Sequence, residues 1–101
     1  MIIYGIKNCD KVRAALKHAK QKGHDAQLHD FRVDGVNEEL VQAMRSDIGM
    51  KHLVNLRSAT YRQLPESDKN NLEIETLVTH PTLIKRPVVF SNGHYTIGLP
   101  E

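Results

Sequence analysis

The sequence predicts an α/β fold, in which a small mixed β-sheet is covered by helices. Two observations carry this prediction. The apolar run at residues 1–4 is closed by Gly5 and followed by helical periodicity, which is typical of a strand, a loop and a helix. Towards the other end, two β-rich runs at 87–90 and 94–97 flank Asn92-Gly93, which is typical of a hairpin. Helical patterns fill the region between them, so strands and helices form one layered structure.

The N-terminal part reads as a strand, a helix and a second strand. The first helix is expected from about Asp10 to Lys22, where Gly23 stops it. A short strand follows over residues 26–31, with Leu28 on its inward side. This order predicts that the first two strands pair in parallel across the intervening helix.

The middle of the chain is mainly helical. A second helix is expected after Asn37, a preferred N-cap residue, and Gly49 ends it. Residues 50–64 contain apolar side chains that fit neither the helical nor the strand period. A short helix at Pro65 and a further helical segment that ends before His80 complete this region. Together with the C-terminal hairpin, this is the order of elements in a thioredoxin-like fold.

Length and composition exclude several classes of protein. The 101 residues suit one domain of ordinary globular composition, with 40% hydrophobic and 26% charged residues. The 14 basic and 12 acidic residues are scattered, so we expect no direct nucleic-acid partner. We find neither a signal-peptide pattern nor an apolar run of membrane-spanning length. A single cysteine excludes an internal disulfide and favours a reducing cytoplasm.

The six histidines raise the question of a metal site. They show no i,i+4 pairing, no accompanying cysteines and no carboxylate at zinc-type spacing. We therefore expect no metal ligands among them and interpret all six as solvated surface residues: His18, His24, His29, His52, His80 and His94.

Cys9 is the first candidate site residue, because it lies at or just before the start of the first helix. The unsatisfied N–H groups and the positive dipole end of a helix favour thiolate over thiol, and so does the nearby charge of Lys7. A thiolate is the form that attacks an electrophile. The alternative is that Cys9 is a small buried hydrophobe without chemical function.

Arg86-Pro87 is the second candidate site, at the mouth of the first hairpin strand. Proline is tolerated there because it has no N–H to contribute to the sheet ladder. It is also where a cis peptide would sit in a thioredoxin-like fold, facing the catalytic cysteine. The alternative is a trans proline that opens a strand beside an ordinary surface arginine.

Five segments together make the sequence recognisable. The chain resembles the arsenate reductase-like (ArsC/Spx) family, most closely its branch of small bacterial ArsC family reductases. The resemblance covers nearly the whole chain in the right order. It rests on Tyr-Gly-Ile-Lys-Asn-Cys-Asp (4–10), His-Asp-Phe-Arg (29–32), Asp-Gly (34–35), Leu-Val-Asn-Leu-Arg-Ser-Ala-Thr-Tyr-Arg (53–62) and His-Pro-Thr-Leu-Ile-Lys-Arg-Pro-Val (80–88).

This resemblance implies a single thioredoxin-like domain over residues 1–101, with a helical insertion at about 37–80. It also implies that Cys9 is the nucleophile and that Arg57 and Arg86 form an anion site. Planar guanidinium groups suit a carboxylate or another oxyanion.

Three neighbours of the cysteine have expected supporting roles. Asn8 orients the loop or donates a hydrogen bond to a bound anion, and Lys7 contributes through its charge. Asp10 is expected to cap the first helix.

Arsenate reductases that couple to glutaredoxin have a histidine shortly before the cysteine, which this chain lacks, so arsenate is not the expected substrate.

The segment Cys9-Asp10-Lys11-Val12 contains no second thiol. A covalent adduct on Cys9 must therefore be resolved by an outside thiol: glutathione, another small thiol or glutaredoxin. Two functions stay open. One is a cytoplasmic, glutathione-linked monothiol reductase with no bound cofactor. The other is a non-enzymatic, Spx-like module that docks on RNA polymerase; one cysteine in a basic anion pocket favours the enzyme.

Overall fold

The computed structural model describes residues 1–99, and the chain divides into two compact units. The first unit contains Met1–Gly35 and Arg86–Glu101, and the second contains Val36–Lys85. The helical insertion expected at about residues 37–80 falls within the second unit. No helix in the described part of the chain is long and apolar enough to cross a membrane.

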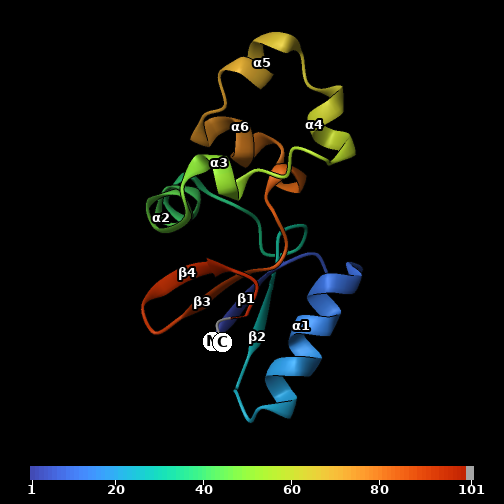
Figure 1. Cartoon of the computed structure of the whole chain (residues 1–101), viewed down its shortest axis with the longest axis vertical. Helices are drawn as coiled ribbons and strands as arrows, with labels where there is room; N and C mark the ends of the chain where they lie inside the picture. The colour runs from blue at the N-terminus through green and yellow to red at the C-terminus, as the bar shows by residue number, and fades with distance from the viewer. Residues whose placement is uncertain (100–101) are drawn as a thin grey trace. The chain divides into compact units, whose positions relative to one another are not determined.

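The first unit contains a four-stranded mixed sheet (Figure 1). Its strands are β1 (Ile2–Gly5), β2 (Gln27–Asp30), β3 (Val88–Ser91) and β4 (His94–Ile97), in the spatial order β2-β1-β3-β4. β1 pairs with β2 in parallel, whereas β1 with β3 and β3 with β4 pair antiparallel. The predicted mixed sheet is therefore confirmed, including the parallel pairing of the first two strands.

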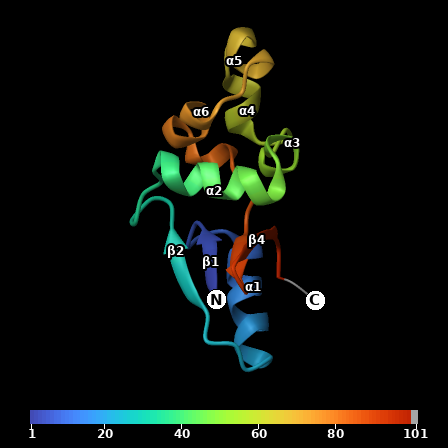
Figure 2. The same cartoon turned by 90° about the vertical axis from the view of Figure 1, so that its left-hand side faces the viewer.

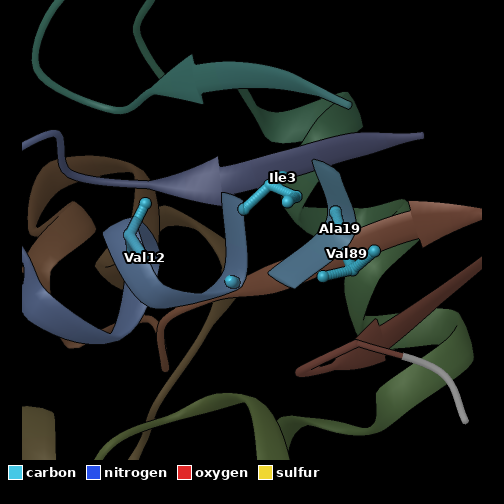
Figure 3. Packing of buried hydrophobic residues seen from close by; sticks show 5 residues of the cluster. Ile3, Val12, Ala19 and Val89 are labelled. Carbon is cyan, nitrogen blue, oxygen red and sulfur yellow. The ribbon is translucent and has the colours of Figure 1, made fainter. Parts of the chain in front are cut away.

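The helix α1 (Asp10–Gln21) packs against one face of this sheet. Figure 3 shows Val12 and Ala19 of α1 directed towards Ile3 of β1 and Val89 of β3. These four side chains have no exposed surface, so they form the core that joins the helix to the two inner strands. The helix ends one residue earlier than predicted.

Aromatic and imidazole rings gather on the opposite face of the sheet. Tyr4 points to that face because successive strand residues point to opposite faces, and its neighbour Ile3 points towards α1. The ring of Tyr4 lies 4.8 Å from that of His29, 5.8 Å from that of Tyr95 and 6.5 Å from that of Phe31, measured between centroids. Burial and the hydrogen bond with Tyr95 raise the pKa of Tyr4 well above its usual range. Tyr4 therefore keeps its proton at physiological pH.

His29 contradicts the prediction that every histidine is a solvated surface residue. Its side chain is half-buried, and its Nε2 lies 2.8 Å from the carbonyl oxygen of Gly35, to which it donates. The cause is the parallel register, which pairs His29 with Tyr4 and places its ring against the tyrosine. The spacing of histidines along the chain, which was used to judge metal binding, does not reveal this pairing between neighbouring strands.

The hairpin of β3 and β4 has the predicted turn. Asn92 has a φ of 54° and Gly93 a φ of 82°, so both residues occupy the left-handed region. A two-residue turn with positive φ at both positions matches the twist of the flanking strands, and asparagine followed by glycine adopts it at the lowest steric cost.

The second unit is helical (Figure 2). α2 (Glu38–Ile48) packs against α3 (Met50–Leu53) and α6 (Ile74–Thr79), as Figure 2 shows. The predicted N-cap of α2 is confirmed, because the Asn37 side chain accepts a hydrogen bond of 2.8 Å from the Leu40 N–H. The elements are α2 (Glu38–Ile48), α3 (Met50–Leu53), α4 (Ala59–Gln63), α5 (Glu66–Asn70), α6 (Ile74–Thr79) and the 3₁₀ helix η1 (Pro81–Leu83).

The apolar residues at 50–64 fit neither the helical nor the strand period because this stretch contains two short helices, α3 of four residues and α4 of five. Neither helix is long enough to display a helical period. Between them, Val54 forms an isolated antiparallel bridge with Ile84. The bridge is flanked by hydrogen bonds from Asn55 N–H to the Leu83 carbonyl (2.7 Å) and from Lys85 N–H to the Leu53 carbonyl (2.8 Å).

Candidate functional site

Cys9 lies where the first strand passes into the first helix. β1 ends at Gly5 and α1 begins at Asp10, so Cys9 is the N-cap residue, with an extended backbone (φ −85°, ψ 126°). Its N–H donates to the Ile6 carbonyl and its own carbonyl accepts from the Arg13 N–H, both at 3.0 Å. The side chain is half-buried and the thiol is free. The predicted position at the helix start is confirmed.

The expectation that Asp10 caps this helix is wrong. The extended backbone that defines an N-cap belongs to Cys9, and Asp10 already has its place in the first helical turn. The exposed carboxylate of Asp10 instead pairs with Arg13, one turn further along α1. Asp10 still favours the helix, because an acidic side chain in the first turn complements the dipole.

The peptide between Arg86 and Pro87 is cis, as predicted. Pro87 is buried and Arg86 is half-buried. In the antiparallel register Tyr4 pairs with Val88, so the residues after β1 and the residues before β3 leave the sheet at the same end. The loop that carries Cys9 and the cis peptide therefore share one end of the sheet.

Sequence reasoning missed Asp30, the last residue of β2. Only 7% of its surface is exposed. Its carboxylate accepts hydrogen bonds from the Arg32 N–H (2.8 Å) and from the Lys7 N–H (3.1 Å). These backbone donors, led by that of Arg32, lower the pKa of Asp30 against the opposing effect of burial.

The contact with Lys7 gives Asp30 a role at the cysteine loop. Gly5 and Asp30 are partners in the parallel register, so the ends of β1 and β2 lie side by side. From there the carboxylate fixes the backbone of Lys7, two residues before Cys9. A signal was present in the sequence: Asp30 is a charged residue inside the predicted second strand, and a charge that is buried there needs partners.

The remaining predicted residues are divided between the two units. Lys7 and Asn8 have exposed side chains beside Cys9, at the end of the sheet that also carries Arg86. Arg57 belongs to the second unit, where it is exposed and lines a cavity of about 370 Å³. Within residues 1–99, no three His, Cys, Asp or Glu side chains are grouped to hold a metal ion.

Residues 4–101 match the model of the ArsC family. The chain belongs to the ArsC family. It is 42% identical to an uncharacterised protein of Haemophilus influenzae, over 98% of this chain and 90% of that protein. Two proteins of Neisseria meningitidis named arsenate reductase are each 24% identical to this chain, over 91% of its length and 84% of theirs, and such relatives support a thiol-dependent reductase-like family.

Two solved structures of ArsC-like proteins resemble this fold. A protein named YffB is 28% identical, with a TM-score of 0.89, and the match covers 98% of this chain and 90% of that one. An arsenate reductase-related protein of Brucella melitensis is 30% identical, with a TM-score of 0.79, over 98% and 86% of the two chains. The ArsC fold is thioredoxin-like, so the predicted fold class is confirmed.

Proposed function

We propose that this ArsC-family protein is a cytoplasmic monothiol reductase that uses glutathione, with Cys9 as its nucleophile. The observation that carries the proposal is the position of Cys9. A free, half-buried thiol stands at the N-cap of α1, at the end of the sheet where Arg86 precedes the cis peptide. The positive end of a helix dipole suits an anionic ligand or intermediate at this position.

The proposed reaction has two steps, each a thiol–disulfide exchange. The Cys9 thiolate attacks the glutathione sulfur of a mixed disulfide, which forms a new disulfide on Cys9 and releases the substrate thiolate. A second glutathione thiolate then attacks the glutathione sulfur held on Cys9. This releases the Cys9 thiolate and glutathione disulfide, so each cycle converts one mixed disulfide and one reduced glutathione into the substrate thiol and glutathione disulfide.

Two arginines are proposed as anion ligands in this reaction, Arg86 of the first unit and Arg57 of the second. Arg86 and Arg57 each present a planar donor fork that suits a carboxylate. Lys7 adds positive charge beside Cys9. Asn8 has an exposed amide next to the cysteine, which is available to donate to a bound anion.

The first test is the glutathione-dependent reduction of hydroxyethyl disulfide. Cys9→Ser should reduce the rate to the uncatalysed background, because the chain has one cysteine. Arg86→Ala should lower kcat/KM about ten- to a hundredfold, the effect of one lost charge-assisted hydrogen bond. Arg86→Lys should recover part of the rate, since lysine keeps the charge and loses the fork.

The exposed Arg45 of α2 provides the control, and Arg45→Ala should leave the rate unchanged. Catalysis that survives Cys9→Ser would contradict the proposal. Unchanged kinetics in both Arg86→Ala and Arg57→Ala would remove the anion site from it. An inactive parent protein that captures RNA polymerase subunits would instead favour the Spx-like interaction module.

The second test measures the reactivity of the thiol itself. Iodoacetamide labels only Cys9 in this chain, so the rate of alkylation reports on one group. At pH 7 we expect Cys9 to be alkylated faster than the thiol of free glutathione, as its proposed role as the nucleophile requires. A rate equal to or below that of glutathione would show that Cys9 is not activated.

A further inference from the structure

The excess positive charge of the chain is concentrated on α1. Residues 10–22, which are α1 and its C-cap residue, contain five of the 14 basic residues and one of the 12 acidic residues. The rest of the chain therefore has nine basic and eleven acidic residues, an excess of negative charge. The charged side chains of this segment are all exposed: Asp10, Lys11, Arg13, Lys17, Lys20 and Lys22.

Three of these cations continue the line of Cys9 along the helix. Arg13, Lys17 and Lys20 follow Cys9 at intervals of four, four and three residues, a spacing that keeps side chains on one side of a helix. The Arg13 N–H donates to the Cys9 carbonyl at 3.0 Å, so Cys9 belongs to the same first turn. At about 1.5 Å per residue, the three cations lie roughly 6, 12 and 16 Å beyond Cys9 along the helix axis. We call these three side chains the basic stripe.

The basic stripe stays on the surface because the adjoining side of α1 packs against the sheet. Val12, Ala15 and Ala19 are buried there, Val12 and Ala19 completely. In residues 1–35 and 86–99, which are the described part of the first unit, α1 is the one α-helix. No second helix of this unit therefore covers the stripe.

The charges of the stripe are available to a partner. Within residues 1–99, neither Lys17 nor Lys20 pairs with a carboxylate. Arg13 pairs with Asp10, but both side chains are largely exposed, and an exposed pair of this kind contributes little and exchanges readily. A partner that brings its own carboxylates therefore meets two unpaired lysines and a weakly held arginine.

A positive stripe attracts acidic proteins, nucleic acids and anionic lipids alike. The position beside Cys9 favours the protein. The proposed reaction of this thiol needs a disulfide, which a protein provides as a glutathionylated cysteine and which nucleic acids and lipid headgroups lack. α1 also has no aromatic side chain on which a base could stack.

We propose that the basic stripe docks protein substrates that have acidic residues beside a glutathionylated cysteine. The inference rests on the proposed function, since it names the substrate class of the same thiol. The carboxylates of the substrate lie along Lys17 and Lys20 while its mixed disulfide reaches Cys9 at the end of the stripe. A bond forms between the sulfurs of Cys9 and glutathione, the bond to the substrate sulfur breaks, and the substrate leaves as a thiolate.

Three synthetic nonapeptides test the proposal. In each, the central cysteine carries glutathione, and the residues two and four positions away on both sides are all glutamate, all glutamine or all lysine. In an extended peptide these positions share one side, about 7 and 13 Å from the cysteine, which matches the spacing of the stripe. At low salt we expect kcat/KM to be about fivefold or more higher for the glutamate peptide than for the glutamine peptide, and lowest for the lysine peptide. The difference should shrink as salt rises.

Two double variants remove the same charge from α1. Lys17→Gln with Lys20→Gln removes it from the stripe. Lys11→Gln with Lys22→Gln removes it from the opposite side, since Lys11 and Lys20 are nine residues apart, about two and a half turns. Glutamine has nearly the helix propensity of lysine, so both variants should keep the helix.

The readout is the ratio of kcat/KM for the glutamate peptide to kcat/KM for uncharged hydroxyethyl disulfide. This ratio should fall about four- to twentyfold in the stripe variant, the effect of two lost exposed ion pairs. The control variant should keep the ratio of the parent protein. Equal rates for the three peptides would overturn the proposal, and so would an equal fall of the ratio in both double variants.

Calorimetric titration of the full-length Cys9→Ser protein separates docking from catalysis. The probe is the glutamate peptide with serine in place of its cysteine, and duplex DNA and phosphatidylglycerol vesicles are the competing anions. Peptide binding that is lost with Lys17→Gln and Lys20→Gln supports the docking surface, even where the parent protein shows no turnover. Turnover of hydroxyethyl disulfide without such binding, or tighter binding of DNA or vesicles than of the peptide, would overturn the docking surface and leave the proposed function standing.

Discussion

Replacing Asp30 by alanine should lower the melting temperature and slow the reaction of Cys9. The substitution leaves the N–H groups of Lys7 and Arg32 without the acceptor that they have in the folded protein. Unpaired backbone donors in a largely buried site are costly, so the loop between β1 and α1 should loosen. The melting temperature and the rate of iodoacetamide labelling measure the two effects.

The pH dependence of the stability tests whether Asp30 acts through its negative charge or only through the size and shape of its side chain. The pKa of Asp30 is lowered in the folded state, so its ionised form stabilises the protein. This contribution is complete above the ordinary aspartate pKa of about 3.9 and is lost as pH falls through the lowered value. The parent protein should therefore lose more stability below about pH 4 than Asp30→Asn, which has no group to titrate at this position.

The exposed Asp25 offers a matched control in the loop before β2. Asp25→Asn should keep both the acid sensitivity and the labelling rate of the parent. If Asp30→Asn shows the same loss of stability in acid as the parent, the carboxylate does not hold the loop through its charge. Normal labelling in Asp30→Ala would show that Cys9 does not depend on the anchored backbone of Lys7.

Gly5→Ala should destabilise the protein by about 1–3 kcal/mol, the usual cost of overpacking a core. A Cβ at this position would lie 2.4 Å from Cγ2 of Val12, which is itself fully buried. The opposing gain, from restricting the unfolded chain, is only about 0.4–1 kcal/mol. Urea denaturation of the two proteins measures the difference in free energy of unfolding.

The double variant isolates the contact. Val12→Ala leaves its own Cβ, which stands 3.5 Å from the added atom and makes an ordinary contact. Gly5→Ala combined with Val12→Ala should therefore cost less than the two single changes added together, with a coupling energy of roughly 0.5–3 kcal/mol. Strict additivity would mean that Gly5 is required for a reason other than its distance from Val12.

Local chemistry made much of the sheet predictable. The turn at Asn92-Gly93 needs positive φ at both residues, and few sequences provide it, so the hairpin followed directly. The position of Cys9 was similarly set by the passage from an apolar run to a helical period. Both signals lie within about ten residues of chain, where propensity and pattern are most informative.

The features that could not be predicted depend on contacts between residues that lie far apart in the sequence. The Asp30 carboxylate and the Lys7 N–H are 23 residues apart, and only the parallel register brings them together. The same register draws His29 against Tyr4. The isolated bridge between Val54 and Ile84 likewise joins residues that lie far apart in the sequence, and no periodic pattern predicts it.

The sheet is assembled from two separate stretches of chain, and this has a consequence during synthesis. β1 is an inner strand whose neighbour β3 begins only at Val88, after the whole helical unit has been translated. The N-terminal β1, α1 and β2 thus leave the ribosome with one edge of β1 unpaired. Because synthesis proceeds at about 5–20 residues per second, that edge stays unpaired for several seconds until β3 has been made. The helical unit is continuous in the chain, so it can complete its backbone hydrogen bonds first.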